Sequence, residues 1–148
     1  MRIYCAGALF NLAEKRFNLQ FSETLGSRLE DVEFVLPQER ASQFLHREDW
    51  SVRMFEDCLQ MIDASDVVLA ILDGPDADSG TSLELGYAYA RGVPVVGVRT
   101  DFRGGEDRGL NLMLSNVCHT LLLEPVDDME VLADRVAPAL ETLRPQRG

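Results

Sequence analysis

The chain has 148 residues, of which 46% are hydrophobic and 26% charged, and its formal net charge at pH 7 is −11. This length and composition are typical of one compact domain with its own core, so we expect a single domain over residues 1–148. The acidic charge repels phosphate backbones and anionic bilayers, which disfavours nucleic-acid and membrane partners and favours a small neutral molecule. No apolar run approaches the ~18 residues of a membrane span, and we expect a cytoplasmic protein.

The cysteines and histidines give no sign of a metal centre or a disulfide framework. Cys5, Cys58 and Cys118 are odd in number, form no CxxC pair and lie in apolar stretches. Such residues are typically free thiols in a reducing compartment. The two histidines are isolated from each other. We therefore expect neither a metal nor a cofactor.

Short apolar runs alternate along the chain with longer segments of helical periodicity. The expected elements, in chain order, are a strand at 2–6, a helix at 12–29, a strand at 32–36, a loop at 37–48, a helix at 50–62, a strand at 66–72, a helix at 81–91, a strand at 93–98, a polar loop at 99–109, a short segment at 110–116, a strand at 119–123 and a helix at 128–143. This alternation predicts an α/β fold with an open parallel sheet of about five strands and helices on both faces, flavodoxin- or Rossmann-like.

Ligands of such folds bind at the carboxyl ends of the strands, beside the point where the strand order reverses. Three segments are therefore candidates for a site: 6–11, 37–48 and 73–82. The third is rich in carboxylates, with Asp73, Asp76 and Asp78, and Glu84 follows it. A solvated turn can have the same composition.

Glu84 is the carboxylate with the most specific position. It follows Gly80, Thr81 and Ser82, which places it in the first turn of the expected helix. The helix dipole there favours an ionised carboxylate, which is a plausible nucleophile at the mouth of a crevice. The spacing of Thr81 and Glu84 fits equally well a capping box, in which Glu84 bonds back to the start of the helix. The residues alone leave both interpretations open.

Four pieces of the sequence together resemble the nucleoside 2-deoxyribosyltransferase family. They are Tyr4 with Gly7 in "IYCAGALF", Asp57 in "FEDCLQMID", "DSGTSLELG" and "LNLML", in the family's order and at similar intervals over nearly the whole chain. The resemblance implies an enzyme that moves 2-deoxyribose from one nucleobase to another through a covalent sugar–enzyme intermediate. It also implies that Glu84 attacks C1′, with a deoxynucleoside and a free nucleobase as substrates and retention of configuration.

The resemblance implies roles for further residues of these motifs. Tyr4 is expected to hydrogen-bond and orient the nucleophile, and Asp57 is expected near the nucleobase as the candidate proton donor. Asp78 corresponds to the acidic residue that holds the sugar hydroxyls, particularly on the 5′ side. Gly7 and Gly80 complete the expected substrate-binding set within the same motifs. Asp73 and Asp76 match no family role and are expected to cap turns.

The "NLM" segment bears on assembly. In the family, the corresponding Asn and Met reach into the active site of a neighbouring subunit, and the Asn contacts the 5′-hydroxyl. By this resemblance, Asn111 and Met113 imply a homo-oligomer with shared active sites, either a dimer or a hexamer. A polar residue that merely begins a helical turn is the alternative. Phe10 is expected to stack on the base, and Gln38 is a candidate for hydrogen bonds to it. Base preference is not implied.

Two other functions compete with the transferase. One is an N-glycosidase that hydrolyses (deoxy)nucleosides or nucleoside 5′-monophosphates, and the second kind must bind a phosphate. Such an enzyme needs phosphate donors, but "CAGALFN" contains no cluster of them, and Asp78 with Asn111 suits a neutral hydroxyl. The other is a non-enzymatic or signalling α/β domain such as a receiver, which needs an acidic pair after its first strand. The segment "CAGAL" has none, so the transferase is favoured.

Overall fold

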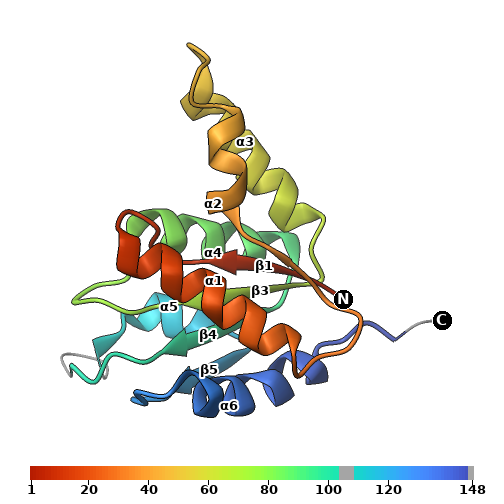
Figure 1. Ribbon diagram of the computed structural model, residues 1–148, viewed down its shortest axis with the longest axis vertical. Coiled ribbons are helices and arrows are strands. Elements are labelled where there is room, and N and C mark those ends of the chain that lie inside the picture. The colour runs from red at the N-terminus through yellow and green to blue at the C-terminus, as the bar shows by residue number, and fades with distance from the viewer. Residues whose placement is uncertain (104–108, 147–148) are drawn as a thin grey trace.

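Five parallel strands form the central sheet of the structure, a computed structural model that describes residues 1–103 and 109–146. In chain order the strands are β1 (Arg2–Ala6), β2 (Glu33–Val35), β3 (Val67–Ile71), β4 (Val95–Arg99) and β5 (Thr120–Leu123). Their order in the sheet is β2-β1-β3-β4-β5, and every neighbouring pair is parallel (Figure 1). This is the flavodoxin-like order, which reverses between β1 and β3. The predicted fold class is confirmed.

Helices cover both faces of this sheet. They are α1 (Leu12–Gly26), α2 (Pro37–Arg40), α3 (Trp50–Asp63), α4 (Ser79–Arg91), α5 (Leu112–Val117) and α6 (Met129–Thr142), with a 3-10 turn η1 (Ala41–Gln43) after α2. One face is covered by α1 and α6, which pack side by side, and the other by α3, α4 and α5 (Figure 1). Of the helices that the structure describes, none has the length and apolar character needed to cross a membrane.

The sheet separates two hydrophobic cores, because successive side chains of a strand point to opposite faces. Within β3, Leu69 packs toward α1 and α6, whereas Val68 packs toward α4. Tyr4 of β1 lies in the second core together with Leu85 of α4. The alternation therefore directs the Tyr4 side chain toward the helix that carries Glu84.

The helix boundaries differ from expectation at two places. The helix predicted at 12–29 ends at Gly26, and the chain continues in hydrogen-bonded turns that keep Leu29 buried. The helix predicted from residue 81 begins at Ser79, because Asp78 caps it. Both shifts reflect local hydrogen bonding that hydrophobic periodicity does not reveal.

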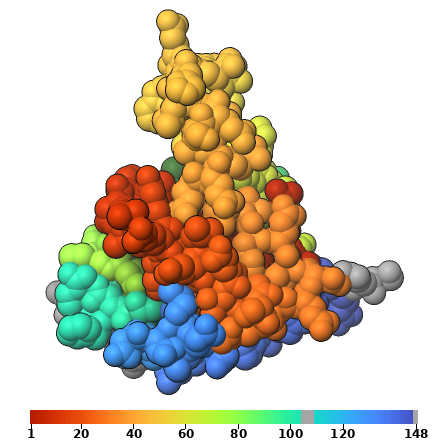
Figure 2. Space-filling model, viewed as in Figure 1, coloured from red at the N-terminus to blue at the C-terminus, as the bar shows by residue number. Residues whose placement is uncertain are grey.

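The segment 37–48, expected to be a loop, contains α2 and η1. Pro37 occupies the first helical position, where its missing N–H costs nothing. The segment, with the first part of α3, projects from the rest of the molecule (Figures 1 and 2). It carries exposed apolar side chains, Leu45, Trp50 and Phe55. The base of this projection lies beside the sheet, where it contributes to the site described below.

Candidate active site

The site is built around a hydrogen bond between β1 and α4. The fully buried Tyr4 hydroxyl donates to Glu84 Oε1 at 2.7 Å. Leu85 and Ala88 anchor α4 in the core, and this anchoring turns the preceding Glu84 toward the end of β1. No described residue donates a hydrogen bond to the other oxygen, Oε2. The carboxylate is thus held by one oxygen and open at the other.

The capping-box interpretation of Glu84 is wrong. The N-cap of α4 is Asp78, whose Oδ2 accepts from the Thr81 backbone N–H at 2.9 Å and from the Thr81 hydroxyl at 3.2 Å. Since the helix begins at Ser79, Glu84 lies in its second turn rather than its first. A cap supplied by Asp78 leaves Glu84 available to Tyr4.

The ionisation of Glu84 is governed by burial. Burial raises the pKa of Glu84 to about 7, the Tyr4 hydrogen bond partly opposes this shift, and the negative charge of Asp78 adds to it. The helix-dipole expectation assumed a position in the first turn of α4, but Glu84 lies in the second turn, and desolvation is the largest effect on its pKa. Burial, and then the charge of Glu84, raises the pKa of Tyr4, so Tyr4 remains a protonated donor.

A second pair of charged residues lies close by. Arg40 of α2 donates from Nε to Asp57 Oδ2 at 2.7 Å and from Nη2 to Asp57 Oδ1 at 2.6 Å. Burial raises the pKa of Cys58, hydrogen bonding with Tyr4 opposes this shift, and the charge of Glu84 adds to it. The charges of Asp57 and Arg40 act on the same thiol. Cys58 is thus an electrostatic neighbour of both pairs.

The loop between β3 and α4 is held in place from β4. Asp73 accepts hydrogen bonds from the Thr100 backbone N–H and hydroxyl, both at 2.6 Å, and so links two loops rather than capping a turn. The buried Arg99 donates from Nη1 to the Leu72 carbonyl at 2.5 Å and from Nη2 to the Gly74 carbonyl at 2.9 Å. These contacts fix the loop that leads to Asp78.

Two glycines allow close packing around these elements. A Cβ atom on Gly7 would lie 3.3 Å from Ile71 Cβ, and one on Gly80 would lie 3.0 Å from Asp78 Oδ2. A side chain at Gly80 would therefore crowd the carboxylate that caps α4. At Gly7 the close neighbour is Ile71 at the end of β3, and at Gly80 it is the Asp78 side chain.

Phe10 and Gln38 lie in other surroundings. The Phe10 side chain is 75% exposed, and its backbone N–H donates to Glu14. The Gln38 amide donates from Nε2 to the Lys15 carbonyl at 2.9 Å, which ties α2 to α1. Neither has a polar contact with Glu84.

Asn111 and Met113 are exposed at the start of α5. Asn111 is its N-cap, and Oδ1 accepts from the Met113 backbone N–H at 2.8 Å. Both line a hollow of about 450 Å³ with Asp76, Ser79 and other residues along α4. No described residue bonds to the Asn111 side-chain nitrogen. The hollow therefore presents an available hydrogen-bond donor beside the beginning of α4.

The chain is similar in sequence to a known protein family. A sequence profile described as nucleoside 2-deoxyribosyltransferase matches residues 3–114, which include the Tyr4, Asp57 and Glu84 positions. The chain belongs to the nucleoside 2-deoxyribosyltransferase family. A nucleoside deoxyribosyltransferase from Lactobacillus johnsonii is 32% identical over 80 residues, which is 54% of this chain and only about half, 52%, of that relative's length.

Solved structures of similar shape extend over almost the whole chain. A conserved protein from Enterococcus faecalis has a TM-score of 0.74 and 27% identity, and the match covers 94% of this chain and 98% of that one. A 2-deoxyribosyltransferase from Bacillus psychrosaccharolyticus has a TM-score of 0.67 and 25% identity, over 90% and 91% of the two chains. Family membership thus agrees with the fold.

The sequence analysis missed Arg40, Cys58 and Arg99. Arg40 stood in a segment predicted as a loop, and an arginine there gives no signal until α2 turns it toward α3. Cys58 directly follows Asp57, and helical periodicity assigned it only to a buried stripe. Among residues 1–103 and 109–146, no group of three or more His, Cys, Asp or Glu side chains could hold a metal ion.

Glu84→Gln should remove a pH-dependent cost from the stability of this family member. The folded-state pKa of about 7 lies above the ordinary value of 4.5. Below pH 4.5 the carboxyl is protonated in both folded and unfolded chains, whereas above pH 7 the folded state bears the cost of a buried charge. The variant should match the wild type at pH 4 and exceed it at pH 8 by on the order of 2 kcal/mol in urea unfolding.

The matched control is Glu56→Gln, at an exposed carboxylate of α3. A gain of the same size in both variants would assign the effect to lost charge in general and contradict the role of Glu84 burial.

Proposed function

We propose that the protein transfers 2-deoxyribose between nucleobases through a covalent intermediate on Glu84. The observation that carries this proposal is the buried Tyr4–Glu84 hydrogen bond, which holds Oε1 at 2.7 Å and leaves Oε2 available. A buried carboxylate with a pKa of about 7 is poorly solvated, and loss of solvation favours attack on carbon. Family membership supports the assignment, and the substrates are a 2′-deoxynucleoside and a free nucleobase.

The proposed reaction consists of two displacements at C1′. In the first, Glu84 Oε2 bonds to C1′ while the C1′–N bond breaks, and its electron pair leaves with the base. In the second, a ring nitrogen of the incoming base bonds to C1′, and the carboxylate departs with the electron pair of the ester bond. Two inversions give overall retention. Tyr4 stays protonated and holds Oε1 in both steps.

We place Asp78 on the sugar side of the site and Asp57 on the base side. Asp78 Oδ2 is occupied by Thr81, whereas Oδ1 accepts no hydrogen bond from a described residue and can accept from a sugar hydroxyl. The expected role of Asp57 is to protonate the departing base. Both of its oxygens accept from Arg40, so this role requires the ion pair to open.

Hydrolysis is the second candidate function, because water can release the same intermediate. The observation that favours it is that Met113 and Asn111 are exposed along a hollow that does not include Glu84, so within a single chain they do not shield Glu84 from water. In the proposed oligomer, these two residues complete the site of a neighbouring subunit, Phe10 and Gln38 flank the base, and water is excluded.

Incubation with deoxyinosine, with and without free adenine, tests the proposal. Chromatography should show deoxyadenosine only when adenine is present, and Glu84→Ala should lose at least ~10³-fold in turnover because it lacks the nucleophile. Glu56→Ala is the matched control and should retain turnover. Free sugar released equally in both incubations would support hydrolysis, and near-normal transfer by the Glu84 variant would contradict the mechanism.

Subunit complementation tests the shared site. Glu84→Ala and Asn111→Ala chains should each be crippled, yet their mixed oligomer combines an intact Glu84 from one chain with an intact Asn111 from the other. After joint denaturation and refolding in equal amounts, random dimers should regain about a quarter of wild-type activity. Each variant refolded alone is the control. Inactivity of the mixture despite demonstrated subunit exchange would contradict a shared site.

A further inference from the structure

The Arg40–Asp57 pair leaves part of the guanidinium available. Asp57 is 9% exposed and engages only Nε and Nη2, while the Arg40 side chain remains 42% exposed. No described residue accepts a hydrogen bond from Nη1. The buried carboxylate thus fixes the plane of the guanidinium and leaves its other edge, with several N–H donors, facing away from Asp57.

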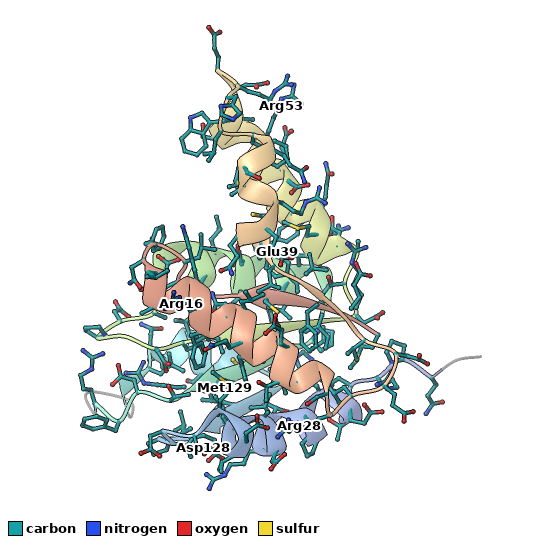
Figure 3. All side chains as sticks on the ribbon, viewed as in Figure 1. Arg16, Arg28, Glu39, Arg53, Asp128 and Met129 are labelled. Atoms are coloured by element: carbon teal, nitrogen blue, oxygen red, sulfur yellow. The ribbon has the colours of Figure 1, made fainter. Side chains whose placement is uncertain are left out.

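This edge lies near the reacting carboxylate. Cys58 follows Asp57 on α3 and packs against the core that contains Tyr4. Its thiol also interacts electrostatically with Glu84 and Arg40. By contrast, Arg53 lies at the far end of the projecting segment, distant from Glu39, the neighbour of Arg40 in sequence (Figure 3). Of these two arginines, Arg40 is the one placed to reach a substrate on Glu84.

The chemistry of a fixed guanidinium edge defines what it can recognise. It only donates hydrogen bonds, so it pairs with base carbonyl oxygens and ring nitrogens and not with an amino group. The O6 and N7 acceptors of guanine match it bidentately, and hypoxanthine has the same two acceptors, whereas adenine presents an amino donor beside N7. Sugar hydroxyls suit the carboxylate of Asp78 better.

We propose that Arg40, oriented by Asp57, determines nucleobase specificity and selects 6-oxopurines over 6-aminopurines. This inference rests on the proposed function and names the substrate class of the same site. The guanidinium also assists departure of the base. When the C1′–N9 bond breaks, its electron pair stays on N9 and delocalises toward O6 and N7, where the cation stabilises it. With the ion pair closed, Asp57 gives no proton to the base. The freed base takes its proton from solvent after it leaves the site, and the incoming base gives its ring N–H proton up to solvent before it binds.

Arg40→Lys is the variant that tests this inference. Lysine keeps a positive charge beside the buried Asp57 but cannot present a fixed two-donor edge. With one common pyrimidine acceptor, the ratio of kcat/KM for deoxyinosine to that for deoxyadenosine should favour deoxyinosine in the wild type and fall about tenfold in the variant. Arg53→Lys is the matched control, since Arg53 also pairs with an aspartate, Asp49, on the same segment, and it should leave the ratio unchanged.

Two further measurements keep the outcome decisive. If Arg40→Lys does not fold, as judged by circular dichroism, Asp57→Asn should lower the same ratio, because Arg40 then loses its orientation. The second measurement is the affinity for free hypoxanthine and for free adenine by calorimetry, which requires no turnover. The wild type should prefer hypoxanthine, and Arg40→Lys should lose that preference.

The outcomes separate this inference from the proposed function. Exchange by the wild type with an unchanged ratio in Arg40→Lys would overturn the inference alone. Absence of turnover with every nucleoside would overturn the proposed function, and base binding would then decide the role of Arg40. A variant that loses activity only toward deoxyinosine 5′-monophosphate would show that Arg40 binds phosphate, which also overturns the inference.

Discussion

The burial of the Glu84 carboxylate beneath the end of β1 is the constraint on which the site depends. Water is largely excluded there, so the carboxylate relies on the Tyr4 hydroxyl for its hydrogen bond. Tyr4 can supply this hydrogen bond because β1 is an interior strand of the sheet and the Tyr4 side chain enters the same core as Leu85. The sheet therefore determines where the Glu84 carboxylate lies, and the Tyr4 hydroxyl lowers the cost of its ionisation.

The architecture could be predicted from the sequence because its signals are local and strong. The apolar residues that follow Asp66 in the expected strand 66–72 indicated a central strand, and β3 lies at the centre of the sheet. It was harder to predict which of two nearby carboxylates would cap α4. Thr81 could have been capped by Glu84 or by Asp78, and only the three-dimensional position of Tyr4 decides between them. The role of Tyr4 itself came from the family resemblance.

Contacts between distant segments were beyond sequence reasoning. Arg40 and Asp57 are 17 residues apart, and their pairing depends on α2, which formed where a loop was expected. Arg99 likewise meets the backbone of the β3–α4 loop only once β3 and β4 are neighbours. Hydrophobic periodicity locates helices and strands, but it does not show which charged side chains become partners across them.

A carboxyl carbon NMR titration is the most direct test of whether Tyr4 tunes the buried carboxylate of Glu84. With ¹³C-labelled glutamate, the Glu84 resonance, assigned by its loss in Glu84→Gln, should titrate with a pKa of about 7. In Tyr4→Phe it should move to higher pH, because removal of the hydroxyl takes away the bond that favours the charged form. A Glu84 pKa near 4.5 that is the same in both proteins would contradict the claim.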